Sequence, residues 1–189
     1  MDMLFSIFSA FGLSASAGLN AYIPLFIVGL LAHYTDLLEL QKPWDTLSNP
    51  WILILLGVLL IIEMLADKVP AVNHINDAIQ TFVRPAAGAI AFAASANVIT
   101  DMSPVLALAC GLLVAGGVHA AKALAVRPAV TATTGGAGNV PVSILEDVVS
   151  TVVSFLAILL PVLVGTLLVV ALALVIWWLW RRMDKSPAR

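Results

Sequence analysis

The chain has 189 residues, of which 61% are hydrophobic and only 11% are charged. Because an ordinary soluble domain has about 25% charged residues, this composition excludes that class and predicts an integral membrane protein. The formal net charge is -2, with no basic run before the last few residues, which excludes nucleic acid as a partner. One crossing needs about 20 residues, so the length suits a single all-α domain, residues 1–189, of about five transmembrane helices.

The first predicted span, residues 4–33, is too long for one straight, upright helix. At about 1.5 Å per residue it would measure roughly 45 Å, against a hydrocarbon core of about 30 Å, so we expect it to tilt or break. Its middle holds GLSASAGLNAYIPL (residues 12–25), where Ser14, Ser16 and Asn20 interrupt the apolar run. One interpretation is packing, in which small and polar residues join neighbouring helices. The other is a locally unwound helix that lines a polar cavity.

The remaining predicted spans are residues 51–67, 77–99, 104–126 and 144–180. The pairs Asn49–Pro50 and Ser103–Pro104 are typical of helix starts, since each combines a capping residue with a proline at the first helical position. The third span carries Arg84 and Pro85 in its first half.

The C-terminal third contains a loop and one very long helix. Residues 127–141 are glycine-rich and predict a flexible linker, after which Ser143 and Glu146 form the S-x-x-E pattern of a capping box. The last span would measure roughly 55 Å as one helix, so we expect a kink at Pro161, and both five and six spans remain open. Tryptophans at 177, 178 and 180 precede RRMDKSPAR, which favours a cytoplasmic C-terminus.

Two stretches of the sequence suggest an internal repeat. Residues 57–68 can be laid over residues 111–122, which aligns Gly57 with Gly111 and Lys68 with Lys122. DAIQT (77–81) similarly matches DVVST (147–151), and SASAGLN in the first span has an echo in AASAN (93–97). These matches favour a degenerate tandem repeat, a plan that several transporters use. The alternative is chance similarity between short apolar strings.

Three longer strings carry a resemblance to a known family. GLSASAGLNAYIPL, LADKVPAVNHINDAIQTFVRPAAGA and GGVHAAKA resemble the small polytopic membrane proteins called domain of unknown function 4126, which occur in bacteria and plant plastids. The resemblance covers almost the whole chain. It implies a membrane fold, and we expect a location in the bacterial cytoplasmic (inner) membrane. It brings no known activity and no functional residue.

Ionisable residues within the predicted spans are the strongest functional signal. Placing one there costs from about 3 kcal/mol upward, so such residues are paired, face the bundle interior or serve function. Glu63 either pairs with Lys68, Arg84 or Lys122, or it takes up a proton or a cation. In a five-span bundle, other charged residues gather at the same membrane face: Asp67, Lys68, Asp77, Arg84, His119, Lys122, Arg127, Glu146 and Asp147.

The sequence holds no catalytic motif and no metal-binding spacing around His74 or His119, so we expect no enzyme, no metal and no cofactor. The leading hypothesis is a transporter or channel for a small solute or ion in the lipid bilayer, assembled as a homo-oligomer. Its polar mid-membrane site would comprise Ser14, Ser16, Asn20 and Asn97, and its charged gate would comprise Glu63, Asp67, Lys68, Asp77, Arg84, His119 and Lys122.

The alternative hypothesis is a non-transporting scaffold or anionic-lipid-binding protein. In that case the polar residues of the spans would hold the helices together. The basic groups would bind a headgroup, and Arg84 suits this because its guanidinium matches phosphate oxygens.

Overall fold

The chain is all-α over the part that the structure describes. The computed structural model describes residues 2–68, 70–96 and 102–183, and no strand occurs among them. Its α-helices are α1 (Asp2–Leu19), α2 (Tyr22–Tyr34), α3 (Pro50–Ala66), α4 (Pro70–Ala96), α5 (Pro104–Ala121), α6 (Arg127–Thr134), α7 (Asn139–Leu159) and α8 (Pro161–Met183). A 3₁₀-helix, η1 (Trp44–Ser48), precedes α3, and a π-helical turn, η2 (Lys122–Val126), joins α5 to α6. The predicted all-α fold class is confirmed.

Several helix ends follow signals that are local in the sequence. Asn49 caps α3, because its side chain accepts a hydrogen bond from the Trp51 N–H (2.9 Å) while Pro50 occupies the first turn. α5 likewise begins at Pro104. The last predicted span divides into α7 and α8 beside Pro161, since proline has no N–H to continue the hydrogen bonding of α7.

Two expectations for the region before α7 are wrong. The predicted flexible linker, residues 127–141, contains α6, and the helical backbone runs without a break from α5 through η2 into α6. α7 begins at Asn139, so Ser143 and Glu146 lie inside the helix and form no capping box at its start. Their side chains face other helices instead: the Ser143 hydroxyl donates to Asp67 (3.4 Å), and Glu146 pairs with Lys122 (2.6 Å). The S-x-x-E pattern here marks a buried polar helix face.

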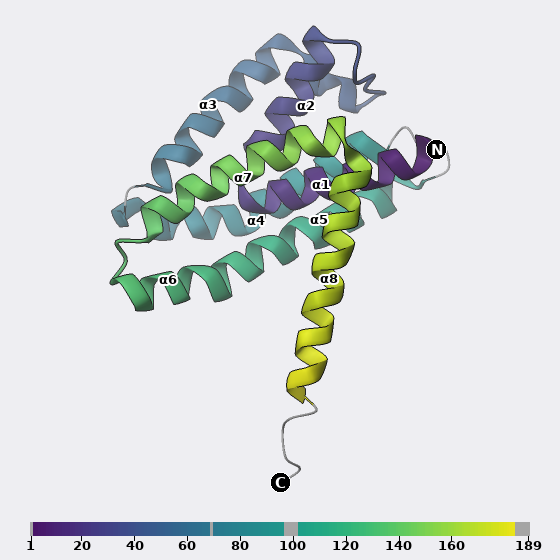
Figure 1. The fold of residues 1–189 in the computed structure, drawn as a ribbon. Coiled ribbons are helices and arrows are strands. Elements are labelled where there is room, and N and C mark those ends of the chain that lie inside the picture. The colour runs from purple at the N-terminus through teal and green to yellow at the C-terminus, as the bar shows by residue number, and fades with distance from the viewer. Residues whose placement is uncertain (1, 69, 97–101, 184–189) are drawn as a thin grey trace.

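α1 is the central helix of the bundle. It lies among α4, α5 and α7, while α2 and α3 form a pair at one side (Figure 1). α8 turns away from the bundle after its first turns, where Gly165 packs directly against Phe8 of α1. Because α1 is surrounded on most sides, its polar residues are among the most enclosed in the molecule.

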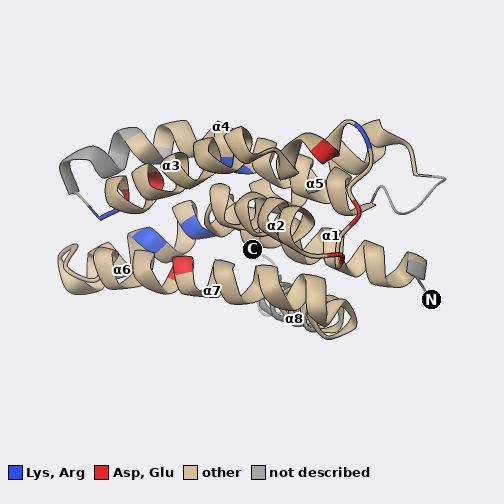
Figure 2. Ribbon diagram, turned by 90° about the horizontal axis from the view of Figure 1, so that it is seen from above, with Lys and Arg blue, Asp and Glu red and all other residues tan. Residues whose placement is uncertain are grey.

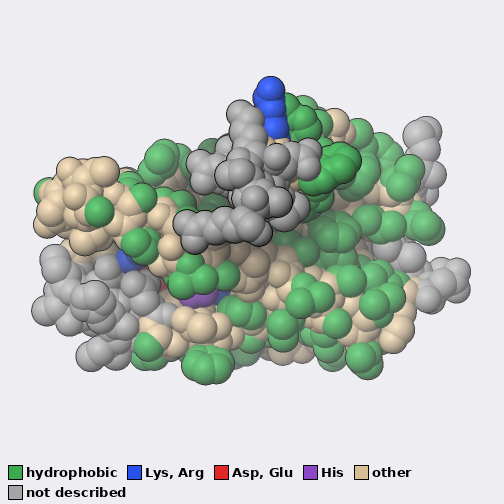
Figure 3. Space-filling model, turned by 90° about the horizontal axis from the view of Figure 1, so that it is seen from below, with side chains coloured by type: hydrophobic (Ala, Val, Ile, Leu, Met, Phe, Trp, Pro, Cys, Tyr) green, Lys and Arg blue, Asp and Glu red, His purple; other side chains and the backbone are tan. Residues whose placement is uncertain are grey.

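Most of the outer surface is apolar. Hydrophobic side chains cover much of the face seen in Figure 3. Two helices, Pro104–Thr134 (31 residues) and Asn139–Leu159 (21 residues), are long and apolar enough to cross a membrane. Only 22% and 28% of their most apolar windows are buried, whereas the core helix of a soluble protein would be mostly buried. Length, composition and exposure together indicate association with a membrane.

Small residues bring α1, α4 and α5 into close contact. A Cβ added at Gly88 of α4 would lie 2.2 Å from the Ala115 Cβ of α5, and one added at Gly18 of α1 would lie 2.6 Å from the Ala115 carbonyl oxygen. Glycine is therefore required for the observed helix separation. This is the close-approach packing typical of membrane helices.

Replacing Gly88 with alanine should destabilise the bundle by about 1–3 kcal/mol, because the added methyl group overpacks the contact with Ala115. Thermal unfolding in detergent measures the effect. Gly117→Ala is the matched control, since a Cβ at Gly117 meets nothing within 4 Å and should leave the midpoint unchanged or raise it. Equal midpoints for the two variants would contradict the packing described.

Candidate functional site

The helical backbone breaks between α1 and α2, where the chain folds back on itself, and Asn20 lies at this break. Its side-chain oxygen accepts hydrogen bonds from the backbone N–H groups of Tyr22 and Ile23 (both 3.1 Å), so it caps α2. Its amide nitrogen donates to Asp147 of α7 (2.9 Å). Asn20 is fully buried. The break therefore lies within residues 12–25, where a locally unwound helix was one of the two interpretations of the sequence. Pro24 lies in the first turn of α2, where its missing N–H costs no helical hydrogen bond.

Two charged side chains reach the backbone ends exposed by this break. The Glu63 carboxylate of α3 accepts from the Ala21 N–H (3.2 Å), at the start of α2. The Lys122 ammonium donates to the Leu19 carbonyl (3.3 Å), at the end of α1. A carboxylate at a helix N-terminus and a cation at a C-terminus both complement the helix dipoles. Lys122 also begins the π-helical turn η2, and such turns are frequent at functional sites.

Arg84 is the centre of a buried ionic network around the break. From α4 it donates to the same Glu63 oxygen through Nε (3.2 Å) and NH2 (2.9 Å), and NH2 also lies 3.3 Å from Asp67. The side chains of Arg84 and Glu63 are 0% exposed. Removing a partner from such a pair would leave an uncompensated charge in a low-dielectric interior.

His119 contacts the free edge of the Arg84 guanidinium. Arg84 NH1 lies 3.4 Å from His119 Nδ1, and His119 Nε2 lies 3.3 Å from the Thr81 hydroxyl. Because a guanidinium can only donate, Nδ1 must be the acceptor in this contact, which assigns the proton of a neutral ring to Nε2. His119 is thus held between two groups of α4.

A second set of pairs connects the end of α3, η2, α6 and α7 with one another. Lys122 pairs with Glu146 (2.6 Å), Lys68 with Asp147 (3.3 Å), and Arg127 with Asp67 (3.4 Å) and Glu146 (3.6 Å). Asn76 adds a hydrogen bond to Asp67 (2.6 Å). The charged residues of these helices gather at one end of the bundle (Figure 2). We call the following set the ionic network: Glu63, Asp67, Lys68, Arg84, Lys122, Arg127, Glu146 and Asp147.

The serines of α1 form hydrogen bonds between helices. Ser14 donates to the Gly111 carbonyl of α5 (2.8 Å). The Ser16 hydroxyl lies 2.8 Å from the Ser150 hydroxyl and 2.7 Å from the Ser154 hydroxyl, both on α7. All of these serines are fully buried. In this conformation they join α1 to α5 and α7, in agreement with the packing interpretation, and their role in transport stays a prediction.

Two of the predicted site residues cannot be placed. Asn97 and the side chain of Asp77 lie outside the described residues. The other charged residues named for the site lie close together near the break: Glu63, Asp67, Lys68, Arg84, His119 and Lys122. Among the described residues, no group of three histidine, cysteine or carboxylate side chains is arranged to hold a metal ion.

The predicted site omits Arg127, Glu146 and Asp147, which the structure includes in the network. A sequence signal for Arg127 does exist. The string VRPA occurs at residues 83–86 and again at residues 126–129, and both of its arginines contact the same Asp67 oxygen (3.3 and 3.4 Å). For α7, the signal is polar residues at helical spacing on one face, Ser143, Asp147, Ser150 and Ser154.

Comparison with known proteins identifies the chain's relatives. A family model described as "Domain of unknown function (DUF4126)" matches residues 7–182. No curated protein and no solved structure matches the chain. The match covers every helix that contributes to the ionic network, together with α2 and all but the first residues of α1. The chain belongs to the DUF4126 family.

Proposed function

We propose that the chain spans a membrane and transports a small solute or ion through a polar site at the break between α1 and α2. The observation that carries the proposal is this break, where Asn20, Glu63 and Lys122 are buried and contact the end of α1 and the start of α2. Irregular backbone at membrane depth is tolerated only where it is enclosed by protein or lines a cavity. Transporters place substrate sites at such discontinuous helices.

The proposed arrangement in the membrane has about five crossings. The apolar, exposed α8 supports a homo-oligomer, since it diverges from its own bundle and leaves Leu167, Val170 and Leu174 uncovered. Arg181 and Arg182 follow the tryptophans at the end of α8, which favours a cytoplasmic C-terminus in the inner membrane.

Gln80 is the candidate first contact for a substrate. It is 2% exposed, and its side-chain oxygen has no hydrogen-bond partner among the described residues. It lies one helical turn before Arg84, on the same face of α4. Buried polar atoms are normally paired, so an open acceptor beside the network suits a substrate that donates a hydrogen bond or carries positive charge.

The balanced charge of the network fits a gate better than a lipid-binding site. Four carboxylates face four cations, and each cation has a carboxylate within 4 Å. An anionic headgroup would have to displace one of these carboxylates. The alternative of a purely structural scaffold stays a prediction, and it differs from transport in whether water ever reaches the break.

Water access to Ser16 separates these two hypotheses. In a Cys110→Ala background, Ser16→Cys should react with a membrane-impermeant thiol reagent, at a rate that changes with an imposed ion or pH gradient. Ser16 is 0% exposed in this conformation, so reaction requires the break to open. Ala91→Cys is the matched control, because Ala91 is equally buried but lies in the apolar core. A cysteine at 16 that is as inert as one at 91 would favour the scaffold.

A further inference from the structure

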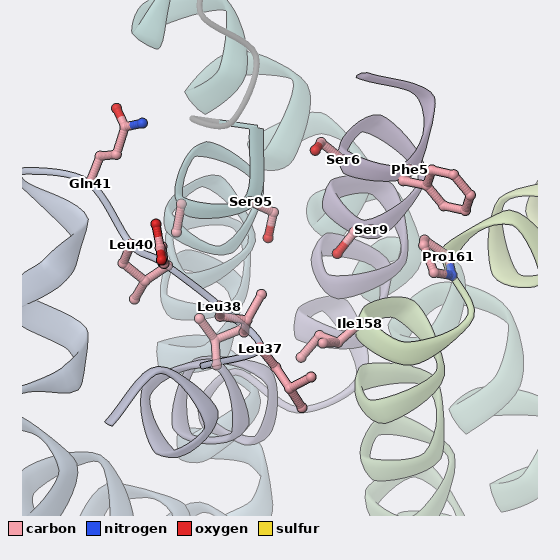
Figure 4. Close-up of a pocket in the computed structure, with 13 residues that line it drawn as sticks. Phe5, Ser6, Ser9, Leu37, Leu38, Leu40, Gln41, Ser95, Ile158 and Pro161 are labelled. Atoms are coloured by element: carbon pink, nitrogen blue, oxygen red, sulfur yellow. The ribbon is translucent and has the colours of Figure 1, made fainter. Parts of the chain in front are cut away.

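A cavity of about 440 Å³ lies at the end of the bundle away from the ionic network. It is a partly open cavity, bordered by the start of α1, the end of α4, the corner between α7 and α8, and the segment 37–41 that follows α2 (Figure 4). Its volume falls within the range of small-molecule sites, about 300–1,000 Å³. No residue of the ionic network lines this cavity.

The cavity is separate from the site at the break. Ser9 at the cavity and Asn20 at the break are eleven positions apart along α1, which corresponds to about 16 Å. Between them the helices are tightly packed: a Cβ added at Gly12 would lie 2.7 Å from the Ala157 Cβ and 2.8 Å from Val164. A molecule in the cavity would not reach the network in this conformation.

The lining combines apolar walls with a few hydroxyl groups. Val28, Leu38 and Ile158 contribute to the walls. The hydroxyls of Ser9 and Ser95 face the cavity from α1 and α4, and neither has a hydrogen-bond partner among the described residues. Such a surface suits a ligand with an apolar body and one polar end.

The charge of the lining restricts that polar end. Glu39 is the one charged residue among the described residues that line the cavity, and neither lysine nor arginine is among them. An anionic group would therefore meet a carboxylate without a cation to offset it. We propose that the cavity binds a small amphiphile whose polar end is an uncharged or cationic hydrogen-bond donor, a hydroxyl or an ammonium group.

Photolabelling of the full-length protein in lipid nanodiscs tests this proposal. The probes are diazirine-bearing octanol, octylamine and octanoate, with labelled residues mapped by mass spectrometry. We expect octanol and octylamine to label the segment 37–41 and the start of α1 severalfold more than octanoate, because Glu39, although exposed, repels an anion at the cavity mouth. Labelling of all three probes to the same extent, or labelling spread evenly over the exposed faces of α3 and α8, would overturn the proposal.

Filling the cavity should prevent labelling. Ser9→Leu places a larger side chain in the cavity and should abolish enrichment at 37–41, whereas Ser103→Leu, an exposed serine outside the lining, should not change it. Leu38→Trp fills the same space from the segment after α2, and it serves if Ser9→Leu lowers the folding yield. Unchanged labelling in a folded cavity-filling variant would overturn the proposal.

The charge of Glu39 should decide the preference between probes. Glu39→Gln should lower octylamine labelling to the level of octanol and raise octanoate labelling, with octanol unchanged. Asp36→Asn, an exposed acid of the same connecting segment that does not line the cavity, is the control and should have no effect. If Glu39→Gln leaves the relative labelling by the three probes unchanged, the proposed recognition is contradicted.

Discussion

Arg84→Gln is expected to lower the free energy of unfolding by about 3–5 kcal/mol, the largest loss of any single substitution in the network. The fully buried guanidinium makes two hydrogen bonds to Glu63 and contacts Asp67, and glutamine cannot neutralise either carboxylate. Denaturant unfolding of the purified protein in detergent measures the loss. Arg181→Gln is the matched control: Arg181 is exposed and contacts only the face of Trp177 (5.0 Å) among the interactions described, so its loss should stay below about 1 kcal/mol.

The double variant Arg84→Gln, Glu63→Gln should recover part of the lost stability. Removing both members of a buried ion pair leaves no unpaired charge, whereas removing one does. Asp67 keeps its contacts with Arg127, Asn76 and Ser143 in all of these variants. A double variant as unstable as the sum of the two single variants would mean that the pair is not coupled, which would contradict the network.

Asn20→Ala should lower the free energy of unfolding by about 2–4 kcal/mol. The substitution removes the cap of α2, worth about 1 kcal/mol, and leaves a buried Asp147 oxygen without its hydrogen-bond donor, worth about 1–3 kcal/mol more. Thermal unfolding followed by circular dichroism provides the measurement.

A second helix cap calibrates the Asn20 result. Asn49 caps α3 through a single bond to the Trp51 N–H, and the pair is exposed. Asn49→Ala should therefore cost only about 0.5–2 kcal/mol. If the two alanine variants lose the same stability, the link from Asn20 to Asp147 adds nothing and the break is an ordinary capped helix end.

Composition and spacing predict the fold class and the region of the break. The high apolar content predicts helices, and the excess length of the first span, together with Asn20 in its middle, predicts an interruption there. Asn49–Pro50 and Pro161 mark helix ends because a cap or a missing N–H acts within one turn of the chain. These features are local, so they can be read without knowing which helices are neighbours.

The pairing within the site could not be predicted, because it depends on helix packing. Spacing along the chain left Glu63 with three candidate cations, and only the approach of α4 to α3 selects Arg84. Ser143 and Glu146 show the same difficulty: three residues apart, they fit a capping box or a buried polar face equally well. The contact of α7 with Asp67 and Lys122 decides between the two.

Flux across proteoliposomes that contain the purified protein, under cation, anion and pH gradients, tests the proposed transport most directly. We predict a selective flux that Glu63→Gln removes while the variant stays folded, because Arg84 keeps its contact with Asp67 and only the carboxylate at the start of α2 is neutralised. Absence of flux under every gradient would contradict transport, and full flux in Glu63→Gln would contradict the assignment of Glu63 to the gate.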